Sequence, residues 1–550
     1  MGKRKKKRKK LSAMKLRLQE HPSFLQSTSP ISLCMIVKNE EKFLAGCLES
    51  VRDVVGEMVV VDTGSTDGTV EIAQRYSAKV FHYEWKDDFA AARNFALRHC
   101  SQPWILFLDA DERLRKGDHD KIRQAVTSGK ADAYYLKVYS TVSGILGDVP
   151  HMQAYPRLFR KLPGAQFEGK IHEQITPSLK KLKARFEYLD ATIDHLGYSQ
   201  EDGVLKNKIK RNLKLLREQI KKEPDNAYAH FQMGQTLLLN EETAEGISYL
   251  KKALNFHTLP NNLTSTTLLM LANEFYKSED YTRALEYIER ALQLAPRQRL
   301  GYFLQSECFA HQNRWPEALN ALDQVRRHSD APFSDISIEK NFDEYLIAQR
   351  FGLYYFNLGK RRQAFLEFSQ YLKTAPTLRS SLLEKWAYAW KLSGSPAHEM
   401  EPLLEHLKTK LEAFDEPVAA AKVLAGIAEI LNKTALMHCF LDFWLKQKPD
   451  DPAALYYLGN QALHQGDYER AAELYSLALK SAGDIWEIHY NLAVTQIKLQ
   501  HYPEAIEVLE KAQRLFPEKE AVIQRLLVGL YGKLGNYERV FQYVNQGTGI

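Results

Sequence analysis

The C-terminal half of this chain repeats its own pattern every 34 residues, and this spacing constrains the fold more than any other feature. Ala471 and Ala505 are equivalent positions in two successive copies, and so are Ala478 and Ala512. Each copy contains two amphipathic stretches, and two short helices of this kind cannot bury their apolar faces alone. Such pairs become stable when neighbours stack, with a small residue where the helices cross. The pattern therefore predicts an all-helical array.

The 34-residue period, the small residues at the helix crossings and the closing Pro residues resemble the tetratricopeptide repeat. Earlier copies surround Ala284 and Ala364, and the stretch that follows them is helical in pattern but departs from the consensus. Unrelated amphipathic helices are the alternative, which the regular spacing disfavours. We expect a solenoid of such repeats over residues 201–379, degenerate helical repeats over 380–450, and repeats again over 451–550.

Before residue 200, short apolar runs alternate with amphipathic stretches. Runs rich in Val, Ile and Leu predict buried strands, and the stretches between them predict helices. Alternation at this spacing indicates right-handed βαβ units and a parallel sheet. We therefore predict an α/β domain over residues 30–200. Its expected strands are 31–37, 57–62, 79–82, 104–108, 133–139, 155–159 and 192–195, and its expected helices are 40–52, 69–76 and 88–99.

Polar clusters follow three of these predicted strands. The first strand leads into the sequence VKNEE, the second ends at Asp62, and the fourth leads into Asp109, Ala110 and Asp111. Because the carboxyl ends of parallel strands meet at one edge of a sheet, these groups should converge where α/β sheets bind ligands. Clustered carboxylates repel one another unless a cation or a hydrogen-bonded ligand offsets their charge. A divalent ion that also binds diphosphate oxygens would do so, and a solvated turn is the alternative for an isolated D-x-D.

In this order, the sequences VKNEE, VVVDTGSTDGT and LFLDADE resemble the motifs of bacterial family 2 glycosyltransferases, which have the GT-A fold. The resemblance is close over residues 30–115 and looser to about residue 200. It implies inverting transfer of a sugar from a nucleoside diphosphate sugar, assisted by a divalent metal, Mg²⁺ or Mn²⁺. It also implies site residues: Val37, Asn39, Glu40 and Asp62 in the nucleotide pocket, Asp109 at the ribose or metal, and Asp111 as the main metal ligand.

Three further segments supply candidate residues. In DDFAAARNFAL, which resembles a segment beside the donor in this family, Arg93 offers a bidentate contact to phosphate, and a surface salt bridge is the alternative. In KIHEQ, Glu173 is the predicted base for the acceptor's proton and His172 is the adjacent candidate, with a surface charge as the alternative for Glu173. His195 is predicted as a further metal ligand, or as a buried structural histidine.

The rest of the composition indicates an ordinary globular chain with a basic tail. The net charge of +7 arises from residues 3–10, which are all Lys or Arg, so the remainder is close to neutral. The five cysteines form no C-x-x-C pair and predict neither disulfides nor a zinc site. Without a secretory signal or an apolar span, we expect a cytoplasmic protein whose residues 1–29 are disordered. Contact of this tail with the inner face of the cell membrane is the alternative, and no nucleic-acid partner is expected.

The expected partners are a nucleotide-sugar donor and an acceptor. Repeat arrays form concave surfaces suited to extended peptides, which favours a peptide or protein acceptor or a protein partner on the repeats. A cell-envelope glycan is the second acceptor class. The competing hypothesis is a scaffold whose repeats bind partners and whose front domain is catalytically inert. The clustered acids at Asp62, Asp109, Asp111 and Glu173 argue against it, because an inert site has no need of them.

Overall fold

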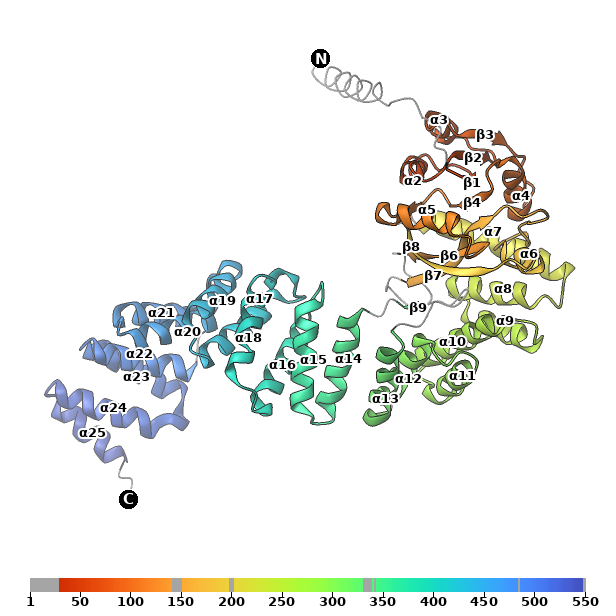
Figure 1. Ribbon diagram of the computed structural model, residues 1–550. Coiled ribbons are helices and arrows are strands. Elements are labelled where there is room, and N and C mark those ends of the chain that lie inside the picture. The colour runs from red at the N-terminus through yellow and green to blue at the C-terminus, as the bar shows by residue number, and fades with distance from the viewer. Residues whose placement is uncertain are drawn as a thin grey trace, which may run out of the picture. The chain divides into compact units, whose positions relative to one another are not determined.

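The computed structural model describes residues 29–140, 151–196, 202–329, 339–340, 343–482 and 485–547. The predicted basic tail therefore lies almost wholly outside the described residues. The chain forms two compact units, the first extending to residue 342 and the second beginning at residue 343. The first contains a sheet, its covering helices and the first helical repeats, and the second is helical (Figure 1). This division does not test the domain boundaries expected from the sequence, which stay predictions.

Four parallel strands form the first half of the sheet. They are β1 (Ile31–Val37), β2 (Glu57–Asp62), β3 (Lys79–His82) and β4 (Trp104–Phe107), in the order β3-β2-β1-β4. β1 pairs in parallel with β2 and β4, and β2 pairs in parallel with β3. β1 and β2 are buried on both faces, as near-continuous runs of Val, Ile and Leu require. The bounds of β1, β2 and β3 confirm those predicted from the sequence.

The second half of the sheet is mixed, so the predicted parallel pairing holds only for the first half. β7 (His151–Arg160) runs antiparallel to both β4 and β6 (Ala133–Ser140). Ten residues separate β6 from β7, which is too few for the crossover of a parallel pair. β8 (Phe186–His195) pairs in parallel with β6 and antiparallel with β5 (Glu112–Leu114). The two-residue β9 (Glu339–Lys340) pairs with β7.

Helices cover both faces of the sheet (Figure 1). On one face α2 (Leu44–Val51), α3 (Thr69–Arg75) and α5 (His119–Ser128) share a core with Leu33 and Met35 of β1. On the other face α4 (Phe89–His99) and α6 (Thr176–Lys181) share a core with Cys34. Successive side chains of a strand point to opposite faces, so β1 supplies both cores in alternation. This burial fixes the strand register and hence the positions of the residues that follow each strand.

Paired helices complete the first unit. α7 (Asp202–Lys222) follows the sheet, and a close approach of the next two helices depends on small residues. A Cβ atom added at Gly234 of α8 would lie 2.7 Å from the Leu250 side chain and 3.0 Å from the carbonyl oxygen of Gly246 in α9, so a larger residue there would force these neighbours to shift. The pairs are α8 (Ala227–Leu239) with α9 (Thr243–Asn255), α10 (Asn261–Lys277) with α11 (Tyr281–Leu294), and α12 (Arg299–His311) with α13 (Trp315–Arg327).

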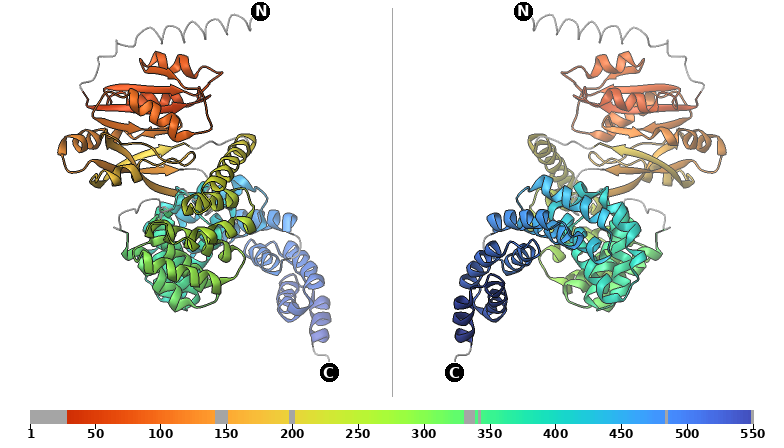
Figure 2. Two further views of the ribbon diagram at one scale, coloured as in Figure 1. Left: turned by 90° about the vertical axis from the view of Figure 1, so that its right-hand side faces the viewer. Right: turned by 90° about the vertical axis from the view of Figure 1, so that its left-hand side faces the viewer.

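The second unit consists of further helices packed in antiparallel pairs (Figures 1 and 2). Over residues 380–450, where the repeat pattern weakens, the helices still share one core with their neighbours, and the departure coincides with the short α17. The helices are α14 (Glu344–Asn357), α15 (Arg361–Thr374), α16 (Ser380–Ser393), α17 (Glu401–Lys408), α18 (Pro417–Ile430), α19 (Thr434–Gln447), α20 (Pro452–Gln465), α21 (Tyr468–Ala482), α22 (Trp486–Lys498), α23 (Tyr502–Leu515), α24 (Glu520–Lys533) and α25 (Tyr537–Gly547).

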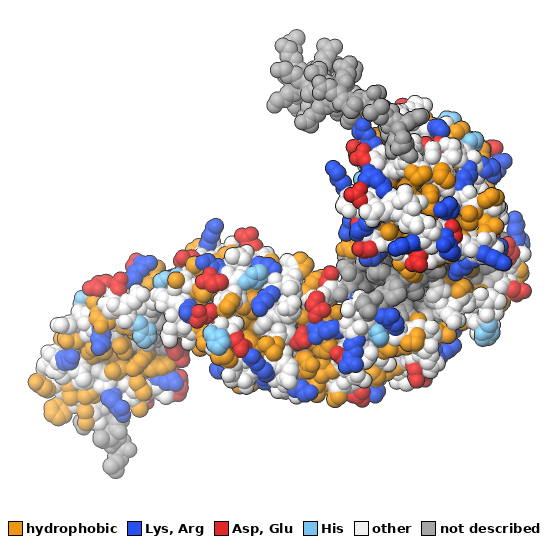
Figure 3. Space-filling view, viewed as in Figure 1, with side chains coloured by type: hydrophobic (Ala, Val, Ile, Leu, Met, Phe, Trp, Pro, Cys, Tyr) orange, Lys and Arg blue, Asp and Glu red, His pale blue; other side chains and the backbone are white. Residues whose placement is uncertain are grey.

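The charged surface is mixed in sign. On the described part of the face seen in Figure 3, Lys and Arg side chains alternate with Asp and Glu and form no extended basic stripe. Nucleic-acid binding surfaces are marked by such stripes, so this face offers no sign of one. Within the described ranges, every helix is too short or too polar to cross a bilayer.

Candidate active site

A cavity of about 850 Å³, hereafter the donor cavity, opens at the carboxyl ends of β1 and β4. Its walls come from the loop after β1, the segment after β4, the start of α4, the segment 171–173 and α7. The structure brings all of the predicted site residues to this cavity except Asp62. Those lining it are Val37, Asn39, Glu40, Arg93, Asp109, Asp111, His172, Glu173 and His195.

The rim of the cavity beside β1 is built by two loops that bind each other. Asn39 has a positive φ of 57°, a backbone conformation that Asn tolerates better than most residues. Its side-chain oxygen accepts a hydrogen bond from the backbone N–H of Thr66 at 2.8 Å. The backbone N–H of Glu40 donates to Thr69 Oγ1 at 2.7 Å. The loops after β1 and β2 are therefore held together before any ligand binds.

Asp62 is the predicted binding residue that the structure places outside the cavity lining. Its buried carboxylate accepts hydrogen bonds from the backbone N–H groups of Gly64 at 3.2 Å and Ser65 at 3.0 Å. Burial alone would raise the pKa of Asp62, but these bonds and His82 lower it. In this structure Asp62 shapes the turn after β2, and its contact with a nucleotide stays a prediction.

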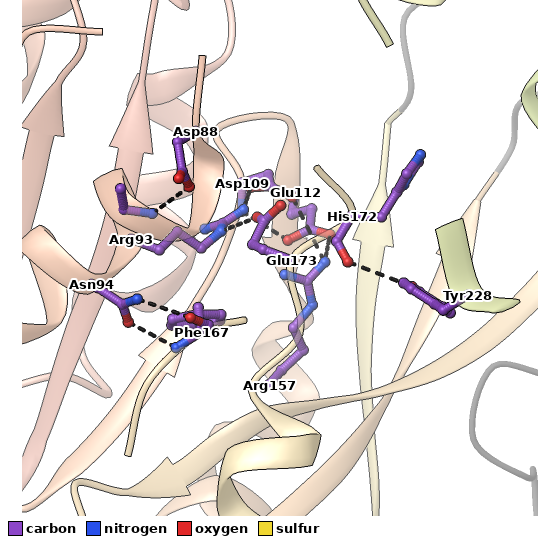
Figure 4. A network of polar contacts seen from close by, with 11 residues as sticks. Asp88, Arg93, Asn94, Asp109, Glu112, Arg157, Phe167, His172, Glu173 and Tyr228 are labelled. Atoms are coloured by element: carbon purple, nitrogen blue, oxygen red, sulfur yellow. Dashed lines mark hydrogen bonds and ion pairs between the residues drawn. The ribbon is translucent and has the colours of Figure 1, made fainter. Parts of the chain in front are cut away.

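Arg93 joins two of the predicted site residues (Figure 4). Asp88 caps α4 by accepting the backbone N–H of Ala91 at 2.8 Å, which fixes the helix that carries Arg93. The guanidinium donates from Nη2 to Asp109 Oδ1 at 2.7 Å and from Nε to Glu173 Oε1. Burial would raise the pKa of Asp109, yet Arg93 and then Arg157 hold it below its usual value. The Asp109 side chain is 42% exposed, so its charged carboxylate also faces the cavity.

Glu112 turns away from the donor cavity and binds a second arginine. Arg157 of β7 donates from Nη2 to Glu112 Oε1 at 2.5 Å and lies 3.8 Å from Asp109 Oδ2. The other carboxylate oxygen of Glu112 accepts the backbone N–H of Asp109 at 2.8 Å. Burial raises the pKa of Glu112, and the charge of Arg157 opposes this effect. The pair thus fixes the backbone at Asp109, a role that the local sequence did not reveal.

Asp111 and His195 face each other across β5 and β8. Strand pairing sets Glu112 opposite His195, and His195 Nε2 lies 3.3 Å from Asp111 Oδ2. Burial lowers the pKa of His195, but the hydrogen bond to Asp111 and the negative charges of Asp111, Glu112 and Asp109 together raise it above its usual value. Among the described residues, no group of three or more His, Cys, Asp or Glu side chains is placed to hold a metal ion. Asp111 and His195 are thus two candidate metal ligands. Asp109 lies beside them, but Arg93 and Arg157 already contact its carboxylate.

His172 sits next to Glu173 in a constrained backbone. Its φ is +53°, and its carbonyl oxygen accepts a hydrogen bond from the Tyr228 hydroxyl of α8 at 3.4 Å (Figure 4). Burial and the charge of Arg211 lower the pKa of His172 to about 4, so its imidazole is neutral at pH 7. A neutral imidazole can accept a proton, although a pKa this low makes it a weak base.

Several lining residues were not found from the sequence. Phe89 lines the donor cavity and packs edge-on against Trp85, with ring centroids 4.7 Å apart. Arg211 and Asn212 reach the same cavity from α7, and the Arg211 guanidinium lies 5.0 Å from the Phe89 ring centroid. No local motif marks these α7 residues, because only the packing of α7 brings them to the site.

Comparison with protein families matches three parts of the chain. Residues 32–193 match the family described as glycosyl transferase family 2. Residues 269–332 match a tetratricopeptide repeat family. Residues 431–512 match a family described as anaphase-promoting complex, cyclosome, subunit 3, and this match lies within the helices of the second unit.

Similar proteins come from several bacteria. A TPR repeat-containing protein of Synechococcus elongatus is 32% identical over 48% of this chain and 66% of its own length. The SPbeta prophage-derived glycosyltransferase SunS of Bacillus subtilis is 28% identical over 59% of this chain and 77% of its own. The lipopolysaccharide core biosynthesis glycosyltransferase LpsC of Rhizobium meliloti is 45% identical over 27% of this chain and 57% of its own. The chain thus spans just under two thirds of the first relative and less of the third.

Proposed function

Because the chain carries a family 2 glycosyltransferase domain followed by tetratricopeptide repeats, we propose that it transfers a sugar from a nucleoside diphosphate to an acceptor. The transfer inverts the configuration at the sugar's anomeric carbon. The acceptor is a peptide or protein, or a glycan of the cell envelope, and the repeats bind this acceptor or a protein partner. Relatives named as glycosyltransferases support the reaction class.

The observation that carries this proposal is the ring of ionic groups around the donor cavity. Asp109 and Glu173 bind Arg93 there, and Asp111 lines the same cavity, at the sheet edge where α/β folds bind nucleotides. Val37, Asn39 and Glu40 form the rim where the nucleoside would lie. Charged groups held in fixed positions at a recessed site stabilise charge that develops during a reaction. A purely structural domain has no need to gather them at an open cavity.

The residues present fit a divalent ion that is shared with the donor. Asp111 and His195, with Asp109 nearby, would hold it as oxygen and nitrogen donors. Mg²⁺ is usually bound by one or two carboxylates together with substrate phosphates, so a set this small is the expected size. When bound, such an ion would neutralise charge on the diphosphate leaving group. Whether the ion is Mg²⁺ or Mn²⁺ depends on the completed coordination shell.

Glu173 is the group we propose as the base. Its carboxylate is oriented by Arg93 and borders the donor cavity. In the transfer it takes the proton of the acceptor's nucleophilic group, and the acceptor atom forms a bond to the anomeric carbon. The bond from that carbon to the diphosphate oxygen breaks at the same time, and nucleoside diphosphate leaves. His172 is the neighbouring group that could serve instead, although its lowered pKa makes its imidazole a weak base.

The test is donor turnover by the full-length chain. A panel of nucleoside diphosphate sugars is incubated with Mg²⁺ or Mn²⁺, and release of nucleoside diphosphate is measured. We expect release from at least one donor and a loss of about 100-fold in Asp111→Asn, since one fixed charge at the reacting centre is removed. Asp120→Asn is the matched control, because Asp120 is an exposed residue of α5 outside the donor cavity.

The competing scaffold function predicts a different outcome. If no donor in the panel is hydrolysed or bound, and Asp111→Asn behaves as the unaltered chain, the front domain is inert. The repeats would then be the functional part of the molecule.

A further inference from the structure

A second cavity, hereafter the repeat-side cavity, lies between the sheet and the first helical repeats. It has a volume of about 370 Å³ and is lined by strands β4, β6 and β7, by residues 172–177, and by helices α8 and α10. The contact between these parts is specific, because the Tyr228 hydroxyl of α8 receives the Gln174 side-chain N–H at 2.7 Å and donates to the His172 carbonyl. Part of the cavity wall therefore comes from the first helical repeats.

The two cavities share a wall. His172 and Glu173 line both the donor cavity and the repeat-side cavity. A molecule in the repeat-side cavity would thus border Glu173 from a different cavity than the donor. An acceptor must reach the base while the donor occupies its own site, and this arrangement allows both at once.

The repeat-side cavity contains buried polar atoms that lack partners. Among the described residues, Gln232 Oε1, Thr266 Oγ1 and His172 Nε2 make no hydrogen bond. Gln232 and Thr266 are only 5% and 3% exposed, and both line the cavity. An unpaired buried polar atom is unfavourable, so these atoms indicate hydrogen-bonding groups that a ligand supplies. His172, the third of these residues, also lines the cavity and is adjacent in sequence to Glu173, the proposed base.

The chemistry of the lining favours a polypeptide. Phe231, Leu263 and Ile175 give apolar surface, whereas Gln232 and Thr266 give isolated hydrogen-bonding atoms of the kind that pair with peptide groups. Lys180 is the one Lys or Arg among the described residues that line this cavity. An anionic envelope glycan would need several cationic contacts, so the lining does not suit it.

We propose that the repeat-side cavity is the acceptor subsite and that it binds a segment of polypeptide. An apolar or aromatic side chain of the segment fills the cavity, and its peptide groups bind Gln232 and Thr266. A neighbouring Ser, Thr or Cys is then held beside Glu173. This inference rests on the proposed function for the role of Glu173, but peptide binding itself needs no turnover.

The experiment compares two hydroxyls on one helix. Peptides are selected from a random phage-displayed library on the full-length chain, and dissociation constants are measured for Thr266→Val, Gln232→Leu and the control Thr267→Val. Thr267 is equally buried on α10, but its hydroxyl already donates to the Leu263 carbonyl at 2.7 Å, and it does not line the cavity.

Thr266→Val should weaken peptide binding about fivefold to tenfold without lowering thermal stability, since the lost hydroxyl has a partner only in the complex. Gln232→Leu should weaken binding at least as much. Thr267→Val should lower thermal stability and leave binding unchanged. The selected peptides should carry an apolar or aromatic residue near a Ser, Thr or Cys.

Three results would overturn the proposal. These are a library that yields no binding peptide, selected peptides that bind all variants equally, and a Thr266→Val variant that loses affinity for an anionic core oligosaccharide instead. Failure of the proposed function is distinguishable. Peptides that lose affinity with Thr266→Val but are never glycosylated with any donor would leave the subsite standing and reject the reaction.

Discussion

Replacement of Arg93 by Met tests whether one buried cation holds the site together. The Arg93 side chain is 8% exposed, and it forms ion pairs with both Asp109 and Glu173. Methionine keeps much of the aliphatic volume but removes the charge and both hydrogen bonds. We expect the two carboxylates to repel each other and Glu173 to lose its fixed orientation.

The size of the effect follows from the exposure of the two partners. Removal of one member of a buried ion pair costs about 3–5 kcal/mol, because the remaining charge is left unpaired. The Glu173 side chain is 11% exposed and bears most of this cost, whereas Asp109 is 42% exposed and can be rehydrated. We therefore expect about 3 kcal/mol, the lower end of the range, which is a change of about 100-fold in the local opening equilibrium.

Hydrogen exchange of the full-length chain measures this opening locally, in peptides that cover α4 and residues 170–175. Protection there should fall about 100-fold in Arg93→Met, and most of the loss should be recovered in Arg93→Met/Glu173→Gln, which leaves no unpaired buried anion. Arg98→Met is the matched control on the same helix, because Arg98 is exposed. A loss below about 0.5 kcal/mol, or a double variant no more stable than Arg93→Met, would refute the reasoning.

Four further substitutions test other parts of the structure. In the folded chain His172 stays neutral down to about pH 4, whereas in the unfolded chain it takes a proton below its usual pKa of 6.5. The free energy of unfolding should therefore fall by at most about 3 kcal/mol between pH 6.5 and pH 4. Urea titrations of His172→Asn should show a smaller dependence on pH over this range. Glu57 is a carboxylate whose pKa is also lowered: burial alone would raise it, but hydrogen bonds lower it to about 2. Its ionised form therefore stabilises the fold by up to about 3 kcal/mol above pH 4.5, and this stabilisation is lost as the pH falls towards 2. Acid titrations of Glu57→Gln should not show this loss. In the second unit, Gly352→Ala should lower the free energy of unfolding by about 1–3 kcal/mol, because the new Cβ would lie 2.5 Å from the Phe368 ring. Gly529→Ala is the contrasting change, because its Cβ would meet nothing within 4 Å. It should stabilise its helix by about 1 kcal/mol, measured by thermal unfolding.

The fold was predictable where burial leaves a strong local pattern. The family matches and the observed elements confirm the predicted α/β GT-A domain followed by tetratricopeptide-like helices. β1 and β2 were predicted to the residue because their apolar runs are continuous. β5 was missed because it has three residues and directly follows Asp111, and α6 was missed because a single turn and a half gives no periodicity. The antiparallel half of the sheet depends on pairings between distant segments, which local patterns do not encode.

The site was predictable where its residues follow strands. Asp109 and Asp111 lie at the cavity because they come shortly after β4, whereas Asp62 is the last residue of β2 and bonds to its own turn. That difference depends on which rotamer the carboxylate adopts among nearby backbone N–H groups, and the sequence does not specify it. Tyr228 could not be assigned at all, because it reaches residue 172 only through the docking of α8.

The hydrogen bonds from Tyr228 to the segment that carries Glu173 have a consequence for engineering. A shortened protein that stops before α8, or a chimera with a foreign array of helices, would lose more than a binding surface for partners. It would expose the rear of residues 172–174 to water and leave their backbone unsupported. The sheet domain and the helices from α8 onward are therefore not interchangeable modules in this molecule, and replacing one requires a redesign of the other.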